Sequence, residues 1–157
     1  MSLAIYKKIM IGWFVIMAAA ASGIAQEEDS LLYSQQDLDR LLSTKVCTSC
    51  NLRGVNLDKV NLEGADLRMS NLSEANLTES KLLGANLEGV NLCNSNLTGA
   101  DISSANASGA VMAGANLNGC KINGCNLTGA DMTGSNLTNV NLETAVLTGA
   151  ILKNIIR

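Results

Sequence analysis

An apolar residue recurs at every fifth position of this chain, from Leu52 to Leu152, and the series never slips. Leucine fills most of these central positions. Two residues before each centre lies a small or short apolar side chain, and one residue before it lies an Asn or Asp in most repeats. Glycine is the commonest residue two positions after the centre. Residues 50–154 therefore read as 21 consecutive repeats of five residues.

A period of five fits neither an ordinary helix nor an ordinary strand. Five residues turn an α-helix by about 500°, so successive centres would drift around its surface. On a flat strand an odd period sends alternate centres to opposite faces. The pattern buries every centre only if the chain bends once per repeat, which predicts a stacked, solenoid-like fold.

The repeat resembles the motif of the pentapeptide-repeat family, which is a small residue, Asn or Asp, Leu and any two residues. Residues 55–59, Val-Asn-Leu-Asp-Lys, and residues 65–69, Ala-Asp-Leu-Arg-Met, show the motif directly. The resemblance implies an all-β solenoid, a right-handed quadrilateral β-helix with four repeats per coil and about five coils. At the spacing of neighbouring strands, five coils form a rod about 25 Å long.

Four repeats per coil would place residues that are 20 positions apart directly above one another. One predicted column consists of asparagines only, and the adjoining column carries alternating charge. We also expect Arg68 and Glu88 to pair across neighbouring coils. The members of the two columns are Asn56, Asn76, Asn96, Asn116 and Asn136, and Asn61, Lys81, Asp101, Lys121 and Asn141.

The first 25 residues have the pattern of a secretory signal peptide. Lys7 and Lys8 precede an apolar run over residues 9–21, and small residues before Gln26 place the expected cleavage after Ala25. The alternative is an uncleaved membrane anchor, but the apolar run is shorter than the ~20 residues that a spanning helix needs. The whole chain has 11 basic and 14 acidic residues. Loss of the two lysines leaves 9 basic residues and a net charge of −5.

Residues 26–49 are expected to be a polar segment followed by a short capping helix. Ser34 with Asp37 resembles a capping box, and Leu38, Leu41 and Leu42 recur at helical spacing. We predict a helix of about ten residues that ends near Ser43. Its apolar side would cover the first coil, because the ends of a solenoid need a cap. The alternative is a free amphipathic segment.

Cys47 and Cys50 form a C-x-x-C motif between this helix and the first predicted coil. Three interpretations are open. A thioredoxin-like redox pair would lie in a βαβ setting, and a zinc site would need four ligands in a chain that has no histidine. A structural disulfide would form in an oxidising compartment. Exported family members of the cyanobacterial thylakoid lumen and periplasm look similar at this place, which favours the disulfide.

The other three cysteines have separate predictions. Cys120 and Cys125 occupy the small inward position of consecutive repeats and are expected to be buried as small apolar groups. Cys93 follows a centre and should point outward. Together with Val111, Ala113 and Ile151 it is predicted to form a small apolar contact surface on one face, interrupted by Asp131. Residues 155–157 are predicted to be a tail that covers the last coil or pairs with another molecule.

Composition argues against most kinds of chemistry. Histidine is absent, and no nucleophile–base constellation or phosphate-binding loop is apparent, so we expect no enzyme activity, no cofactor and no metal site. We predict an exported structural or interaction module of the thylakoid lumen or periplasm. It would be a monomer with an unknown protein partner, without nucleic acid, and free of the membrane once the leader is removed.

The alternative function is DNA mimicry, because some members of the family resemble a DNA duplex and bind gyrase. The leader, the modest negative charge and the absence of phenylalanine from the repeat centres argue against it.

Overall fold

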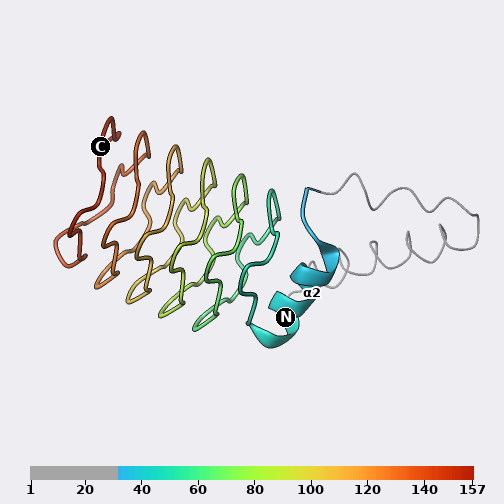
Figure 1. Ribbon diagram of the computed structural model, residues 1–157. Helices are drawn as coiled ribbons and strands as arrows, with labels where there is room; N and C mark the ends of the chain where they lie inside the picture. The colour runs from blue at the N-terminus through green and yellow to red at the C-terminus, as the bar shows by residue number, and fades with distance from the viewer. Residues whose placement is uncertain (1–31) are drawn as a thin grey trace, which may run out of the picture. The chain divides into compact units, whose positions relative to one another are not determined.

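The computed structural model describes residues 32–157, so the predicted signal peptide, residues 1–25, lies outside the described residues. The described part begins with a single α-helix, α2, over Gln35–Thr44. From Val46 onward the chain winds through stacked coils that lie side by side as far as the C-terminus (Figure 1). Helix α2 lies where the sequence pattern predicts a helix, and it ends one residue beyond the expected position.

The coils are joined by isolated parallel bridges between residues 20 positions apart. Four such columns run along the unit, which makes each coil four repeats long and the cross-section four-sided. The first bridge joins Val46 to Asp66, so the ladder begins four residues before the predicted boundary at Cys50. The last bridge joins Asn136 to Ile156. Ile156, in the predicted tail, thus lies in the ladder of the last coil, and pairing of the tail with another molecule stays a prediction.

Most repeats use their backbone groups in the same way. The centre N–H and the N–H two residues later donate to the next coil, as Leu57 does to Asn76 (2.8 Å) and Lys59 does to Thr78 (2.8 Å). The residue before the centre donates to the preceding coil, as Asn76 does to Val55 (2.9 Å). Because nearly all backbone groups find partners in this way, very short bridges suffice to hold the fold.

The corner of each repeat explains the glycines. In every repeat except the one centred on Leu142, the residue two positions after the centre adopts a left-handed backbone conformation, with φ of 65° at Gly99 and 58° at Lys59. Glycine reaches this region without the steric cost that other residues meet. The glycines therefore serve the turn and give no indication of a phosphate-binding loop.

The core is a column of leucines and small residues inside the coils. Every centre from Leu52 to Leu137 is at most 2% exposed, and the small residues beside them are also buried. The prediction of burial as far as residue 154 is wrong for the last coil, where Leu142, Leu147 and Leu152 are only half-buried. No further coil of the described residues packs on these three side chains.

Of the two predicted side-chain columns, one is complete in the structure and the other is not. The bridges stack the asparagines from Asn56 to Asn136 without a gap. In the charged column the prediction fails at its last member, because the bridges run from Asn61 to Lys121 and Asn141 is unpaired. Gly124 there donates to the Thr144 hydroxyl (3.1 Å) instead of to a backbone carbonyl of the last coil. The last coil therefore separates from the coil beneath it on this one face.

Candidate functional site

The N-terminus of helix α2 forms the first candidate site, where the helix docks on the first coil. Ser34 caps the helix, since its hydroxyl accepts the Asp37 N–H (3.2 Å). The second half of the predicted capping box is absent, because the Asp37 carboxylate does not return to Ser34. It accepts the Asn51 N–H (2.9 Å) and pairs with the Arg40 guanidinium (3.0 Å).

Asn51 is the main anchor for the segment before the coils. Its N–H binds Asp37, its carbonyl accepts the Ser34 N–H (2.9 Å), and its side-chain amide donates to the Leu32 carbonyl (3.3 Å). In the interior coils the corresponding N–H and carbonyl bind the preceding coil. At Asn51, the N-terminal segment therefore supplies the hydrogen bonds that a preceding coil would make. Sequence reasoning missed this role, because Asn51 matches the repeat like any other asparagine.

Apolar contacts of α2 support the same docking. Leu41 is completely buried, whereas Leu38 and Leu42 are half-buried. The three predicted apolar residues thus contribute unequally, and one of them forms the anchor. Burying a leucine side chain stabilises a structure by roughly 2 kcal/mol, which is comparable to the polar contacts made through Asn51.

The C-x-x-C motif lies inside the first coil and not before it. Cys47 takes a centre position, one coil below Leu67, and Cys50 takes the small inward position below Ser70. Their sulfurs are bonded to each other, and their Cα atoms are 5.4 Å apart. Both residues are buried, at 0% and 2% exposure. Cys47 Sγ also lies 3.2 Å from the Asp37 carbonyl oxygen, so the pair is in contact with α2.

The Asp37 carboxylate and the two sulfurs are the one group of possible metal ligands that the described residues bring together, within 4.8 Å. The group fits a metal poorly. Both sulfurs are used in the bond between them, and both carboxylate oxygens already accept hydrogen bonds from Arg40 and Asn51. A structural zinc site would also require a fourth ligand. We therefore treat this cluster as part of the docking site.

The remaining cysteines lie as predicted. Cys120 and Cys125 are 3% and 0% exposed, and burial raises the pKa of both thiols to about 12. A neutral buried thiol is a poor nucleophile, so these two residues act as small apolar groups. Cys93 is a free thiol and is partly exposed.

The predicted contact surface of Cys93, Val111, Ala113 and Ile151 lies along one face. Val111 is 36% exposed and Ile151 is 41% exposed, while Cys93 and Ala113 are partly exposed on consecutive coils. Asp131 separates Val111 from Ile151 in the column, as predicted. The patch is therefore apolar but small and interrupted.

Some charged side chains on the coils lie close to partners of opposite sign. Arg68 pairs with Asp66 in its own repeat (2.7 Å), not with Glu88 as predicted, and this ion pair holds the pKa of Asp66 below its usual value. Lys121 lies 4.0 Å from Asp101 on the neighbouring coil. Exposed pairs of this kind stabilise a fold by at most about 1 kcal/mol.

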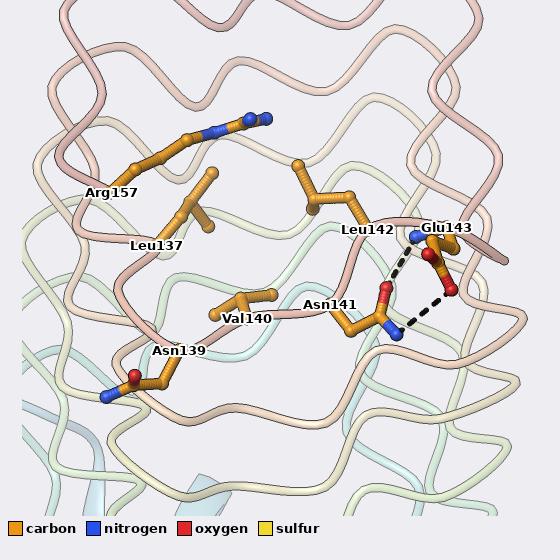
Figure 2. Close-up of a pocket in the computed structure, with 7 residues that line it drawn as sticks. All are labelled: Leu137, Asn139, Val140, Asn141, Leu142, Glu143 and Arg157. Atoms are coloured by element: carbon orange, nitrogen blue, oxygen red, sulfur yellow. Dashed lines mark hydrogen bonds between the residues drawn. The ribbon is translucent and has the colours of Figure 1, made fainter.

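An open concavity lies where the last coil separates from the ladder (Figure 2). It is open to solvent, has a volume of about 460 Å³, and is lined by Leu137, Asn139, Val140, Asn141, Leu142, Glu143 and Arg157. Its polar groups bond to each other, since the Asn141 side chain accepts the Glu143 N–H (2.8 Å). It brings together no nucleophile and base, so it has no features of a catalytic site.

Among residues 32–157, no helix has the length and apolarity that crossing a bilayer requires. A comparison with curated proteins gives no match for the chain.

Comparison with known proteins identifies the repeats. The family model for pentapeptide repeats matches the chain over residues 46–82, 70–106, 95–134 and 125–155. The solved structure of a pentapeptide-repeat protein, Rfr23, from the cyanobacterium Cyanothece 51142 is 35% identical. The match has a TM-score of 0.74 and covers 77% of this chain and 97% of that protein.

A pentapeptide-repeat protein of the Arabidopsis thaliana thylakoid lumen is also similar. It is 30% identical with a TM-score of 0.63, and the match covers 66% of this chain and 72% of that protein. Both structures agree with the quadrilateral β-helix described above. The family model begins at residue 46, where the first bridge of the ladder forms. The chain therefore belongs to the pentapeptide-repeat family.

Proposed function

We propose that the protein is a non-enzymatic scaffold of the thylakoid lumen or periplasm that binds a protein partner through the face carrying Cys93, Val111, Ala113 and Ile151. Solenoids present long regular surfaces, and binding through such surfaces is their usual role. The similar protein from the Arabidopsis thylakoid lumen supports an exported location, as do the predicted leader and the bonded Cys47–Cys50 pair.

The observation that carries the proposal is the identity of the residue at position 111. In the same column Asn91 and Asp131 use their side-chain oxygens to accept the N–H two residues later, at 3.0 Å in both cases. Valine cannot accept a hydrogen bond, so Val111 gives up this local contact and exposes an apolar side chain in its place. Valine at this position does not stabilise the fold, whereas an exposed apolar side chain would contribute to a contact with a partner.

The charge distribution supports a protein partner over DNA mimicry. Asp66, Glu74, Glu79 and Asp101 each lie within 4.0 Å of a lysine or arginine. A DNA-like surface needs rows of unpaired negative charge that act together over the length of the rod. Local pairing removes part of that field, and the net charge of −5 expected for the mature chain is small.

The test is capture of the partner from the native exported compartment. A photo-crosslinker attached to Cys93 should label one protein reproducibly. The control carries the crosslinker on the neighbouring face, at Thr98→Cys in a Cys93→Ser background, and should not label it. Val111→Asn restores the residue type of the column and should abolish the crosslink while the melting temperature stays within 2–3 °C of the original. Equal labelling from Cys93 and from the control position would refute this surface.

The location has its own test. Mass spectrometry of the protein isolated from its native cell should find a mature chain that begins within two residues of Gln26. A full-length chain in the membrane fraction would support the anchor instead, and would contradict the proposed compartment.

A further inference from the structure

One corner of the coils differs from all the others. In every other repeat with a centre between Cys47 and Leu152, the residue two positions after the centre has a positive φ, whereas Thr144 does not. Thr144 is also the one β-branched residue that occupies this position in these repeats. A side chain that branches at Cβ is the least tolerated kind in the left-handed region, because it crowds the neighbouring backbone. The residue type at this corner therefore explains its different backbone conformation.

The ladder is broken at the same corner. One coil below, the Lys121 N–H and the Lys121 carbonyl each bond to the preceding coil, at 2.9 Å in both cases. Asn141 takes the next place in this column, but its N–H does not reach the Cys120 carbonyl, and its carbonyl does not accept the Ile122 N–H. A third ladder bond is replaced by the contact between the Thr144 hydroxyl and the coil beneath.

The break belongs to this corner and does not result from the place of the coil at the end of the ladder. The same coil keeps its backbone bonds to the coil beneath on its other three faces. These bonds run from the Val146 N–H to the Cys125 carbonyl, from the Ile151 N–H to the Ala130 carbonyl and from the Ile156 N–H to the Ser135 carbonyl, each at 2.9 Å. A missing upper neighbour would affect all four faces, whereas the change is confined to the face that ends at Thr144.

We propose that residues 139–145 form a flap that opens while the other coils stay folded. Thr138 and Val146, on either side of the flap, keep backbone bonds to the coil beneath, at 2.9 Å each. Between them, the bonds from the flap to that coil come from the side chains of Asn139 (3.2 Å) and Thr144 (3.1 Å). Figure 2 shows residues 139–143 of this segment beside the open concavity. Few backbone bonds and exposed side-chain contacts are typical of a segment that opens locally.

The flap covers a thiol that reports on its opening. Cys120 takes the small inward position of a repeat, and Val140 takes the same position one coil above. Cys120 is 3% exposed, so a reagent reaches its sulfur when the covering segment moves. Cys125 lies beneath the next corner, where the Val146 N–H binds its carbonyl, and Cys93 is partly exposed. The three thiols therefore report on the flap, on the intact ladder and on the reaction of an accessible cysteine.

Thiol labelling of the unaltered protein tests whether the flap opens by itself. The protein is treated with a maleimide in the absence of reductant, and each cysteine is followed through the mass of its peptide. Cys93 should react first, and Cys120 should react at least about tenfold faster than Cys125, because its cover is less firmly held. Equal rates at Cys120 and Cys125 would show that both thiols become accessible in one larger unfolding event, which would overturn the flap.

Two substitutions separate the branched side chain of Thr144 from its hydroxyl. Thr144→Ser removes the branch, and serine takes the left-handed conformation at Ser49 and Ser104, with φ of 57° and 56°. The corner should then close and restore the three ladder bonds, which should slow the labelling of Cys120 by about tenfold or more. Thr144→Val keeps the branch and removes the hydroxyl, so it should not slow the reaction. Slower labelling in both variants, or unchanged labelling in Thr144→Ser, would overturn the role of the branch.

The next corner of the same coil allows the break to be moved. Gly149 has a φ of 68°, and a Cβ atom there would meet no other atom within 4 Å, so the backbone conformation is the obstacle to a side chain. Gly149→Thr should open this face and speed the labelling of Cys125 by about tenfold. Thr148→Ser, one residue before this corner, is the control and should leave both rates within about twofold. Unchanged labelling of Cys125 in Gly149→Thr would also contradict the proposal.

Hydrogen exchange on the unaltered protein gives a measurement that needs no variant. The Ile102 N–H, one coil below, and the Leu127 N–H, on the next face, each bond to a backbone carbonyl, at 2.9 Å and 2.8 Å. The Ile122 N–H makes no such bond and lies beneath the flap. It should exchange at least about tenfold faster than the other two amides. Equal protection of the three amides would show that the ladder is closed at Thr144 and would overturn the flap.

Discussion

Leu97→Ala is the sharpest test of the core that the coils enclose. Leu97 is completely buried, and its N–H and the preceding carbonyl hold it between the coils that carry Leu77 and Leu117. The substitution removes three carbons, which corresponds to about 2.4 kcal/mol of transfer free energy at roughly 0.8 kcal/mol per methylene. The ladders above and below fix the spacing of the coils, so the space left by the side chain cannot collapse. A cavity term raises the expected loss to about 3–4 kcal/mol.

Leu142→Ala is the matched control in the last coil. Leu142 also occupies a centre position, but it is half-buried and lines the open concavity, so water already reaches it. Its removal should cost about 1 kcal/mol. Thermal unfolding followed by circular dichroism should show a melting temperature lowered by roughly 10 °C or more for Leu97→Ala, and by less than about 4 °C for Leu142→Ala.

Urea unfolding separates a loss of stability from a change in the surface that is exposed on unfolding. The midpoint should fall for Leu97→Ala while the slope of the transition stays unchanged, because both states expose the same surface as before. Equal losses at the two positions, or a loss below 1 kcal/mol at Leu97, would refute the assignment of the centres to a closed core.

Three further outcomes follow from the structure. Ser34→Ala removes the cap of α2 and should cost about 1 kcal/mol, seen as faster hydrogen exchange within the helix, and unchanged exchange would contradict the capping role. Burial raises the pKa of the Cys120 and Cys125 thiols to about 12. Because these thiols ionise at a lower pH in the unfolded chain than in the folded protein, the free energy of unfolding should fall as the pH rises from about 9 toward 12. A Cys→Ala double variant should show a flatter alkaline profile. Arg68→Gln should move the pKa of Asp66 upward in an NMR titration. The variant should then be less stable at neutral pH and lose less stability than the original protein as the pH falls through the acidic range. An unchanged pKa would show that the ion pair is not formed.

The fold could be predicted from the sequence because the same five-residue pattern occurs more than twenty times without a change of register. The period requires a bend at each repeat. The coil of four repeats, which the resemblance to the family implies, then places residues 20 positions apart above one another, as the bridges do. Burial of the centres from Leu52 to Leu137 follows from the same pattern. The prediction of burial fails at Leu142, Leu147 and Leu152. The repeat motif identifies which side chains point inward, but it does not show whether another coil covers them.

The docking site was much less predictable. The ladder starts at Val46, and Cys47 replaces the usual leucine, so the first repeat does not match the motif that marks the others. The partner of Arg68 was assigned wrongly because stacking places Glu88 one coil away, while Asp66 lies two positions back and accepts two hydrogen bonds from the guanidinium. The contacts of the Ser70 hydroxyl with Cys47 and Cys50 could not be predicted at all, since serine is an ordinary residue at the small inward position of a repeat.

The way the first coil is covered explains why the capping box of α2 is incomplete. The N–H and carbonyl of Asn51 would both be left without partners at the edge of a β-helix, and such edges invite pairing with other chains. In a full capping box the N-cap N–H would be satisfied within the helix. Here the Ser34 N–H is directed to the Asn51 carbonyl, and the Asp37 carboxylate accepts the Asn51 N–H. One donor and one acceptor of the helix start are thereby used to imitate a preceding coil. The helix gives up part of its own capping, and the edge of the β-helix is closed at Asn51.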